Sequence, residues 1–342
     1  MKTILIITRD PLVHFRQMRN TGGITDDGEF RFVINDTSCR PDFVVIKEKG
    51  LRVPTMFDVP RSHTILLTGE PYSILCYPRK FCAQFGTVLA CQPQIKPIPG
   101  TNVIHTQAIL TWFVGATFEQ DGTNRFPMNY EDIRRANPEK TKLISVISSN
   151  KAFSRGHVDR LRFMEKLKER YGDRIDIYGR GNRGFADKWE VLAPYKYHIV
   201  IENSTGDYYW TEKLADCYLA GTFPIYHGCT NIGSFFPERA LVPVDIRNFD
   251  RTAEIIDATL AADLYTERQP ELAVSKQLVL DKYNMFNFIA EICRGIGDTN
   301  EAGPTLINPA SKYFSWHNWY LYTVGRNYYK MCNWMRKLRV KN

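Results

Sequence analysis

The sequence predicts an α/β protein of two domains, each with a parallel β-sheet, that face each other across a cleft. Two observations lead to this prediction. With 342 residues, the chain is longer than one hydrophobic core usually organises. Short apolar runs recur along it, and in the second half they alternate with amphipathic segments, which is typical of parallel sheets covered by helices on both faces. We place the domains at residues 1–140 and 141–310, followed by a C-terminal tail at 311–342.

Six short apolar runs, separated by Gly, Pro, Asp and Asn, predict the strands of the first domain. They are KTILIIT (2–8), FRFVIN (30–35), PDFVVIK (41–47), HTILLTGEP (63–71), TVLACQ (87–92) and NVIHT (102–106). Helical periodicity between them is weak, apart from a segment near 10–20. We interpret the polar, proline-containing stretch 129–142 as a linker.

The second domain shows a clearer alternation of strands and helices. Its predicted strands are KLISVISSN (142–150), RIDIYGRG (174–181), YHIVIENS (197–204), TFPIYHG (222–228) and ALVPVDI (240–246). Amphipathic helices are predicted at 157–172 and 211–221, each closed by a glycine, with Thr211 as the N-cap of the second. Residues 248–296 predict two further amphipathic helices with a structural role. His198 and His227 lie within apolar strands, so we expect them to be packing residues.

The tail at 311–342 concentrates the charge of the chain. It holds seven basic and no acidic residues, which is +7 of the formal net charge of +8, together with nine aromatic residues. Basic charge interleaved with Trp and Tyr suits the surface of an anionic membrane. Binding of single-stranded nucleic acid and simple packing of a C-terminal helix are the alternatives. We favour peripheral membrane contact and expect no nucleic-acid partner.

The rest of the composition narrows the class of protein. The longest apolar run near the N-terminus, Ile4 to Thr8, is too short for a signal-peptide core or a membrane helix. The eight cysteines form no Cys-x-x-Cys pair, so neither a zinc site nor a disulfide framework is indicated. We therefore expect a cytoplasmic protein that is peripheral at the inner face of the membrane.

The stretch IENSTGDYYWTEKL, residues 201–214, carries the clearest functional signal. Glu202 and Asn203 follow a strand, and Glu212 and Lys213 open the next helix. In parallel sheets ligands bind beyond the carboxyl ends of the strands, and phosphate binds at the positive N-terminus of the following helix. Glu212 is suited to sugar hydroxyls and Lys213 to a diphosphate, so these residues predict a nucleotide site. The alternative is a capped surface helix with solvated Glu and Lys side chains.

Residues 195–237 resemble the donor-binding motif of glycosyltransferase family 10, the α-1,3/4-fucosyltransferases. The matching features are Tyr-Lys-aromatic, Glu-Asn-Ser, a short loop, Thr-Glu-Lys, and a strand with Pro and a Gly turn. The resemblance extends with less force over 142–250. It implies a GT-B fold, with two Rossmann-like domains facing across a cleft, the N-terminal one for the acceptor and the C-terminal one for GDP-fucose. It also implies inverting transfer of fucose to a hydroxyl of an acceptor sugar.

The resemblance assigns roles to single residues of the donor domain. Ser149 and Asn150 end a strand, and Arg160 falls at the pyrophosphate-binding arginine, although Arg155 and Arg162 are its neighbours. In the donor loop Asn203, Tyr209, Glu212 and Lys213 keep the family's spacing, whereas Asp207 and Trp210 are less typical. YGRGNRG (178–184) does not match a dinucleotide fingerprint and predicts a tight turn, from which Tyr178 or Arg180 could line the guanine pocket. In this fold terminal helices often return to the other domain, so we expect part of 275–330 to pack on the N-terminal half.

ILLTGEP, residues 65–71, is similar to the family's strand that ends in Thr-Gly-Glu. Glu70 would then be the general base, while Arg160, Lys213 and the helix N-terminus would stabilise the departing diphosphate. The chain has no Asp-x-Asp triplet, and Asp26-Asp27 predicts a turn. We therefore expect no cofactor and no obligatory metal.

Some features of the function stay open at this level. The donor could be another nucleotide sugar, or the chain could be a non-catalytic membrane- or nucleic-acid-binding protein on this fold. Without an N-terminal membrane helix it looks like a bacterial or viral member of the family. Such a member would act on a glycolipid or on a surface polysaccharide precursor, such as that of lipopolysaccharide. The divergent first domain would set the acceptor and the linkage.

Overall fold

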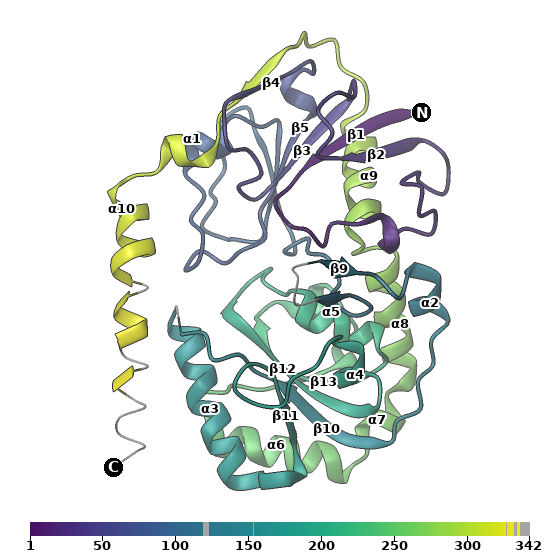
Figure 1. Cartoon of the computed structure of the whole chain (residues 1–342), viewed down its shortest axis with the longest axis vertical. Coiled ribbons are helices and arrows are strands. Elements are labelled where there is room, and N and C mark those ends of the chain that lie inside the picture. Colours follow the sequence, from purple (N-terminus) through teal and green to yellow (C-terminus); the bar gives the residue numbers. More distant parts are fainter. Residues whose placement is uncertain (119–122, 153, 326, 332–333, 336–342) are drawn as a thin grey trace.

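Two parallel β-sheets, one from each half of the sequence, dominate the computed structural model of the chain (Figure 1). The structure describes residues 1–118, 123–152, 154–325, 327–331 and 334–335. Each sheet has its own hydrophobic core, and the carboxyl ends of both sheets face the space between the two domains. This arrangement confirms the predicted α/β fold with two domains.

The N-terminal sheet has six parallel strands in the order β2-β1-β3-β5-β6-β7. The strands are β1 (Lys2–Ile7), β2 (Phe30–Ile34), β3 (Phe43–Lys47), β5 (Thr64–Leu67), β6 (Thr87–Ala90) and β7 (Asn102–His105). All six predicted strands are confirmed. The helix expected near 10–20 is wrong, because only a 3₁₀ turn forms at Phe15–Gln17. Asp10 accepts a hydrogen bond from the backbone N–H of Leu12 at 3.0 Å, a local turn that competes with a helix.

Segments from the end of the chain complete the N-terminal domain. Helix α9 (Met285–Ile296) buries Phe286 and Ile289 against one face of the first sheet. Strand β15 (Thr305–Ile307) pairs with β4 (Thr55–Phe57), and Ile307 joins the core on the other face, near the short helix α1 (Arg79–Cys82). The expected return of the chain to the N-terminal half is confirmed. Residues from Met285 to Ile307, which lie in the sequence range 141–310, therefore belong in space with the first sheet.

The C-terminal sheet has five parallel strands in the order β11-β10-β12-β13-β14. The strands are β10 (Lys142–Ile147), β11 (Asp176–Tyr178), β12 (Tyr195–Gly206), β13 (Phe223–Cys229) and β14 (Val242–Pro243), with helices α3 (Arg155–Tyr171), α4 (Trp189–Leu192) and α5 (Glu212–Leu219). All of the predicted strands and both predicted helices of this half are confirmed. The order places the ends of β10 and β12 side by side, where such sheets bind ligands.

The remaining helices differ from the sequence prediction in two places. The stretch taken as a linker contains α2 (Tyr130–Arg135), because Asn129 and Asp132 form a reciprocal capping box. The region predicted as two helices contains α6 (Phe249–Ala261), α7 (Leu264–Glu267), α8 (Gln269–Leu280) and α9. A left-handed residue, Asp263, separates α6 from α7. A two-stranded ribbon, β8 (Thr117–Phe118) with β9 (Asn124–Arg125), lies between the domains in sequence.

Helix α5 is anchored to the segment that joins the domains. Asp216, which is fully buried, accepts hydrogen bonds from the backbone N–H groups of Phe113 at 2.9 Å and Val114 at 3.2 Å. From the N-terminal domain, Arg16 donates to the carbonyl oxygens of Trp112 at 2.6 Å and Val114 at 3.0 Å. These contacts fix α5 relative to the first sheet.

The tail leaves the N-terminal domain and runs beside α3 (Figure 1). It contains α10 (Trp316–Trp319) and a π-helix (Tyr320–Gly325). Trp316 and Trp334 are strongly exposed. Five of its basic residues, Arg326, Arg336, Lys337, Arg339 and Lys341, lie outside the described residues. Within the described part of the chain, no helix is long and apolar enough to cross a membrane.

Candidate functional site

Three adjoining cavities meet at Asn203, at the end of β12. We call them the interdomain cavity (about 480 Å³), the inner cavity (about 200 Å³) and the outer cavity (about 320 Å³), and Asn203 lines all three. The interdomain cavity is lined by both domains, including Lys47, Glu48 and Glu70 from the first and Glu212 and Lys213 from the second. The inner cavity lies over β10 and β12, and the outer cavity lies between α3 and β13. Most predicted site residues therefore gather at one place.

Glu202 organises the start of α5. It is 1% exposed, and its carboxylate accepts hydrogen bonds from the backbone N–H of Thr211 at 2.8 Å and from the Thr211 hydroxyl at 2.7 Å. Thr211 is the N-cap of α5, as predicted. Burial raises the pKa of Glu202, and the nearby charge of Lys213 opposes this rise. The role of Glu202 in this structure is to hold Thr211 and Lys213.

Lys213 lies between two carboxylates. Its Nζ is 3.2 Å from Oε2 of Glu202 and 3.2 Å from Oε1 of Glu212. Burial lowers the pKa of Lys213, but the two carboxylates outweigh it and the net shift is upward. Burial raises the pKa of Glu212, yet Lys213 and Lys188 bring it down to about 2. Glu212 and Lys213 are therefore charged near neutral pH, and a diphosphate would compete with the carboxylates for Lys213.

Arg160 is a buried cation without a carboxylate partner among the described residues. Its guanidinium donates to Oδ1 of Asn203 at 2.8 Å, and to the carbonyl oxygen and hydroxyl of Ser149, both at 3.1 Å. Burial lowers its pKa to about 10, so it stays positive at neutral pH. A β-carbon at Gly156 would lie 2.4 Å from the carbonyl oxygen of Asn203, so only glycine lets α3 approach β12 this closely. This approach aims Arg160 into the inner cavity, where its charge favours an anion.

Lys151 is a functional candidate that the sequence prediction missed. It lines both the interdomain and the inner cavity and makes no ion pair with the described residues. The sequence could have indicated Lys151, because it directly follows Ser149 and Asn150, just beyond the carboxyl end of β10. Lys188, also missed, lines the inner cavity and pairs with Asp216 at 2.8 Å. The two lysines add positive charge beside Arg160.

Glu70 reaches the interdomain cavity from the end of β5. Its backbone carbonyl accepts a hydrogen bond from the Gln92 side chain at 2.6 Å, which fixes the turn after the strand. Its carboxyl group shares the cavity with Glu212 and Lys213 of the other domain. Burial raises its pKa, and the charge of Glu48 raises it further. A carboxylate with a raised pKa is suited to accept a proton.

A second group of charged residues, also missed from the sequence, lies beside Glu70. The Lys47 ammonium is buried, 3.0 Å from Asp10 and 3.4 Å from Glu48. Glu48 has a left-handed backbone (φ 54), and a β-carbon at Gly69 would lie 2.4 Å from its Oε1. Gly69 therefore makes room for Glu48 next to Glu70. The sequence showed only an apolar strand ending in Lys-Glu-Lys.

Tyr209 connects the two domains at the site. Its ring packs on Cys91 and Ala108 of the N-terminal domain, and it lines the interdomain cavity. Trp210 points the other way, into an aromatic cluster with Phe236 and Tyr283. The residue that looked atypical in the loop is thus part of the hydrophobic core.

Two predicted residues are not presented to the cavities in the way we expected. Tyr178 is buried, its hydroxyl lies 2.7 Å from that of Tyr195, and its ring packs against Phe185. Asn150 is exposed at the end of β10. His198 is a packing residue, as predicted: it is buried 2.8 Å from the Ser145 hydroxyl, and burial lowers its pKa to about 3. Among the described residues, no group of three or more His, Cys, Asp or Glu is arranged to hold a metal.

Two parallel sheets whose carboxyl ends share a cavity define the class of the protein: it has the GT-B fold of glycosyltransferases. The fold matches a solved structure described as the crystal structure of an α1,3-fucosyltransferase with GDP-fucose. That match covers 88% of this chain and 92% of the other, with a TM-score of 0.50 and 15% identity. Within the fold, residues 137–266 match the family model of glycosyltransferase family 10, described as the C-terminal domain of the fucosyltransferases.

Known proteins resemble a part of the sequence. The α-(1,3)-fucosyltransferase FucT of Helicobacter pylori is 38% identical over 71 residues, which are 20% of this chain and 15% of that protein. The α-(1,3)-fucosyltransferase 4 of Bos taurus is 36% identical over 78 residues, 21% of this chain and 20% of that protein. The aligned segments thus span no more than one fifth of these relatives.

Proposed function

We propose that the protein is an inverting glycosyltransferase that moves L-fucose from GDP-fucose to a hydroxyl of an acceptor glycan. One observation carries this proposal: Glu70 of the N-terminal sheet faces Lys213 of the family 10 domain across the interdomain cavity. A base on one side and cations on the other are what an inverting transfer requires. The relatives that are named as α-1,3-fucosyltransferases support fucose as the transferred sugar.

In this proposal each group has one task in the reaction. The acceptor oxygen forms a bond to the anomeric carbon of fucose, on the face opposite the nucleotide. The bond from that carbon to the phosphate oxygen breaks, and its electron pair leaves with GDP. Glu70 takes the acceptor proton, and its raised pKa suits this task. Arg160 and Lys213, with the N-terminus of α5, stabilise the charge on GDP.

The donor would lie along the inner cavity. Arg160 is already directed there by Ser149 and Asn203, and Lys151 lies beside it without an ion pair to any residue that the structure describes. Glu212 would accept from the ribose hydroxyls, which requires its carboxylate to give up part of its contact with Lys213, now 3.2 Å away. We propose that these cations take the place of a divalent metal, so that no metal is obligatory.

The location of the protein belongs to the proposal as well. The exposed rings of Trp316 and Trp334, together with the seven basic residues in the sequence of the tail, support peripheral contact with an anionic membrane. We propose a cytoplasmic enzyme that acts at the inner face on a glycolipid or on a polysaccharide precursor such as that of lipopolysaccharide.

The decisive experiment follows GDP release from GDP-fucose, with a panel of acceptor sugars and EDTA present. Wild type is compared with Glu70→Ala and Lys213→Ala. We expect turnover that survives EDTA and is lost in both variants. Turnover that disappears with EDTA would contradict metal independence. Thermal stabilisation by GDP and by UDP, measured in parallel, separates a fucosyltransferase from a transferase that uses a uridine-linked donor.

A further inference from the structure

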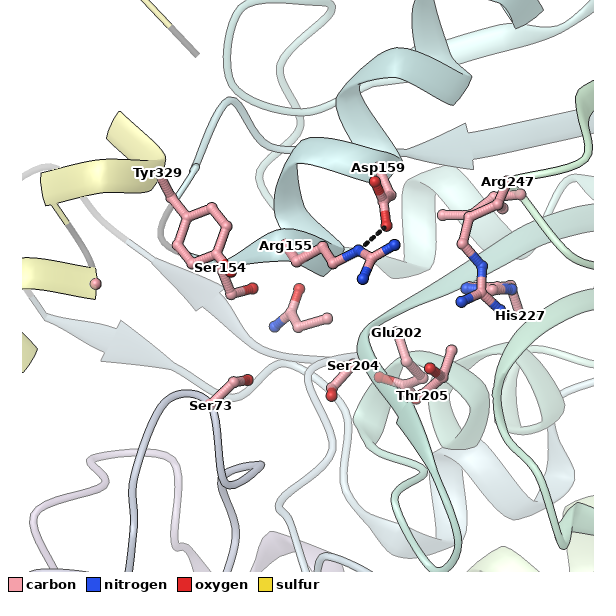
Figure 2. Close-up of a pocket in the computed structure, with 14 residues that line it drawn as sticks. Ser73, Ser154, Arg155, Asp159, Glu202, Ser204, Thr205, His227, Arg247 and Tyr329 are labelled. Carbon is pink, nitrogen blue, oxygen red and sulfur yellow. Dashed lines mark ion pairs between the residues drawn. The ribbon is translucent and has the colours of Figure 1, made fainter. Parts of the chain in front are cut away.

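The outer cavity is a part of the site to which the proposed reaction assigns nothing (Figure 2). It has a volume of about 320 Å³, within the range of small-molecule sites. Its walls come from the first turn of α3, the end of β12 and the end of β13, and Tyr329 of the tail closes one side. Ser73, only three residues after Glu70, contributes from the N-terminal domain.

The charges around this cavity balance one another. Arg155 pairs with Asp159 at 3.8 Å, shown as the dashed line in Figure 2, and Arg247 pairs with Asp245 at 2.9 Å. The remaining titratable side chain of interest in the wall is His227. Its Nδ1 must donate to the carbonyl oxygen of Val244 at 3.0 Å, because a carbonyl can only accept. The cavity therefore presents no unbalanced cation among the described residues, unlike the inner cavity with Arg160.

His227 is neutral in this position. Burial lowers its pKa, and the hydrogen bond to Val244 and the charge of Asp245 only partly oppose this. With the proton on Nδ1, its Nε2 is an acceptor. His227, which the sequence suggested was a packing residue, thus also lines the cavity. Its Nδ1 bonds to Val244, and its Nε2 has no hydrogen-bond partner among the described residues and can accept from a ligand.

Hydroxyl groups make up much of the remaining wall. The side chains of Ser73, Ser204 and Thr205 line the cavity and make no hydrogen bond with the part of the chain that the structure describes. Tyr329 adds a ring face and a phenol. Balanced ion pairs, hydroxyls that donate and accept, and an aromatic ring fit a polar, uncharged, hydroxyl-rich ligand better than they fit an anion or an apolar molecule.

We propose that the outer cavity binds a neutral sugar ring of the acceptor glycan, next to the ring that carries the attacking hydroxyl. The inference rests on the proposed function, because it takes Glu70 as the place where that hydroxyl reacts. Ser73 and Asn203 connect the two places: Ser73 follows the Glu70 turn, and Asn203 lines both cavities. On this view the donor domain and the tail, and not only the N-terminal domain, select the acceptor.

The test measures glycan binding directly. The labelled full-length chain, with saturating GDP, is applied to an array of neutral and carboxylated oligosaccharides. We expect wild type to retain neutral glycans of two or more rings. The double variant Ser204→Ala/Thr205→Val, which removes two hydroxyls at nearly constant shape, should lower this signal about tenfold, the effect of one or two lost hydrogen bonds. Ser234→Ala, an exposed serine of the same domain that lines none of the three cavities, is the matched control.

A second variant gives a signature that loss of folding cannot produce. Asp159→Asn removes the partner of Arg155, so the cavity gains one unbalanced positive charge. Its preference should move toward carboxylated glycans. The inference is overturned if the variants bind the array as wild type does, if wild type prefers carboxylated glycans, or if wild type retains none. The stabilisation of each protein by GDP is measured separately, and its absence in wild type would reject the proposed function instead.

Discussion

The Nζ of Lys213 lies 3.2 Å from Oε2 of Glu202, a carboxylate almost fully withdrawn from water. Lys213→Met should therefore destabilise the fold as well as abolish activity. Removing one member of a buried pair leaves an uncompensated charge, which typically costs about 3 kcal/mol or more. Urea denaturation of wild type and variant measures the free energy of unfolding.

The double variant Lys213→Met/Glu202→Gln separates stability from catalysis. With both charges removed, most of the lost free energy of unfolding should return, although the Thr211 contacts of Glu202 change as well. Activity should not return, because the cation for the diphosphate is missing. A double variant as unstable as Lys213→Met would show that the pair is not the source of the cost.

Arg160 should behave in the opposite way. Because no described carboxylate pairs with its guanidinium, Arg160→Gln leaves no orphaned charge, and we expect only a modest loss of stability. Its effect should fall on GDP affinity, with a decrease of tenfold or more for the loss of charge-assisted hydrogen bonds. The melting temperature is measured with and without GDP, and Arg162→Gln on the same helix is the control. Equal GDP stabilisation in the Arg160 variant and the control would exclude Arg160 from the diphosphate site.

The pH dependence of activity should report Glu70. Burial and the neighbouring Glu48 raise its pKa above the ordinary value, while Lys213 and Lys47 oppose the rise. A general base works when deprotonated, so activity should increase with pH as it passes through this raised pKa. Glu48→Gln removes a like charge, which lowers the pKa of Glu70 and moves the acid limb of kcat/KM to lower pH.

The direction of that movement is the critical observation. A purely structural role of Glu48 would reduce the rate at every pH without moving the limb. A shift of the limb to higher pH would mean that the pKa of Glu70 rises when Glu48 is lost, for example because Lys47 moves away from Glu70 once its partner is removed. That result would contradict the coupling between Glu48 and Glu70. Asp132→Asn, far from the cavity in the α2 capping box, is a control for general destabilisation.

The sequence predicted the sheets well because a parallel sheet is built from local apolar runs. All eleven strands of the two large sheets coincide with such runs. The α2 capping box and the break at Asp263 were missed, because they depend on hydrogen bonds and backbone angles of a few residues within polar stretches.

The site was predictable where it follows a strand end and a helix start. Glu202, Thr211 and Lys213 meet as expected, but the sequence did not show that Lys213 is paired with two carboxylates. Glu48 was invisible because its role depends on its position beside Gly69, two strands apart in the chain but adjacent in the sheet. Tyr178 packs against Phe185 and not toward the cavities, which could not be foreseen because strand order alone cannot tell which way a ring at a strand end turns.

The C-terminal tail is predicted to bind anionic membranes, and the structure shows where it can be shortened without loss of packing contacts. Ala310 and Tyr313 pack on the N-terminal domain, and the Tyr313 hydroxyl lies 3.1 Å from Gln84, so removing all of 311–342 would damage the fold. A chain that ends at Ser315 keeps these contacts and loses the exposed aromatic residues from Trp316 onward. We expect it to retain its melting temperature and its stabilisation by GDP but to stop sedimenting with anionic vesicles. The wild-type interaction should weaken with added salt, since charge contributes to it. Truncated protein that still sediments would place membrane contact elsewhere on the molecule, and wild type that never sediments would leave the tail a packing element beside α3.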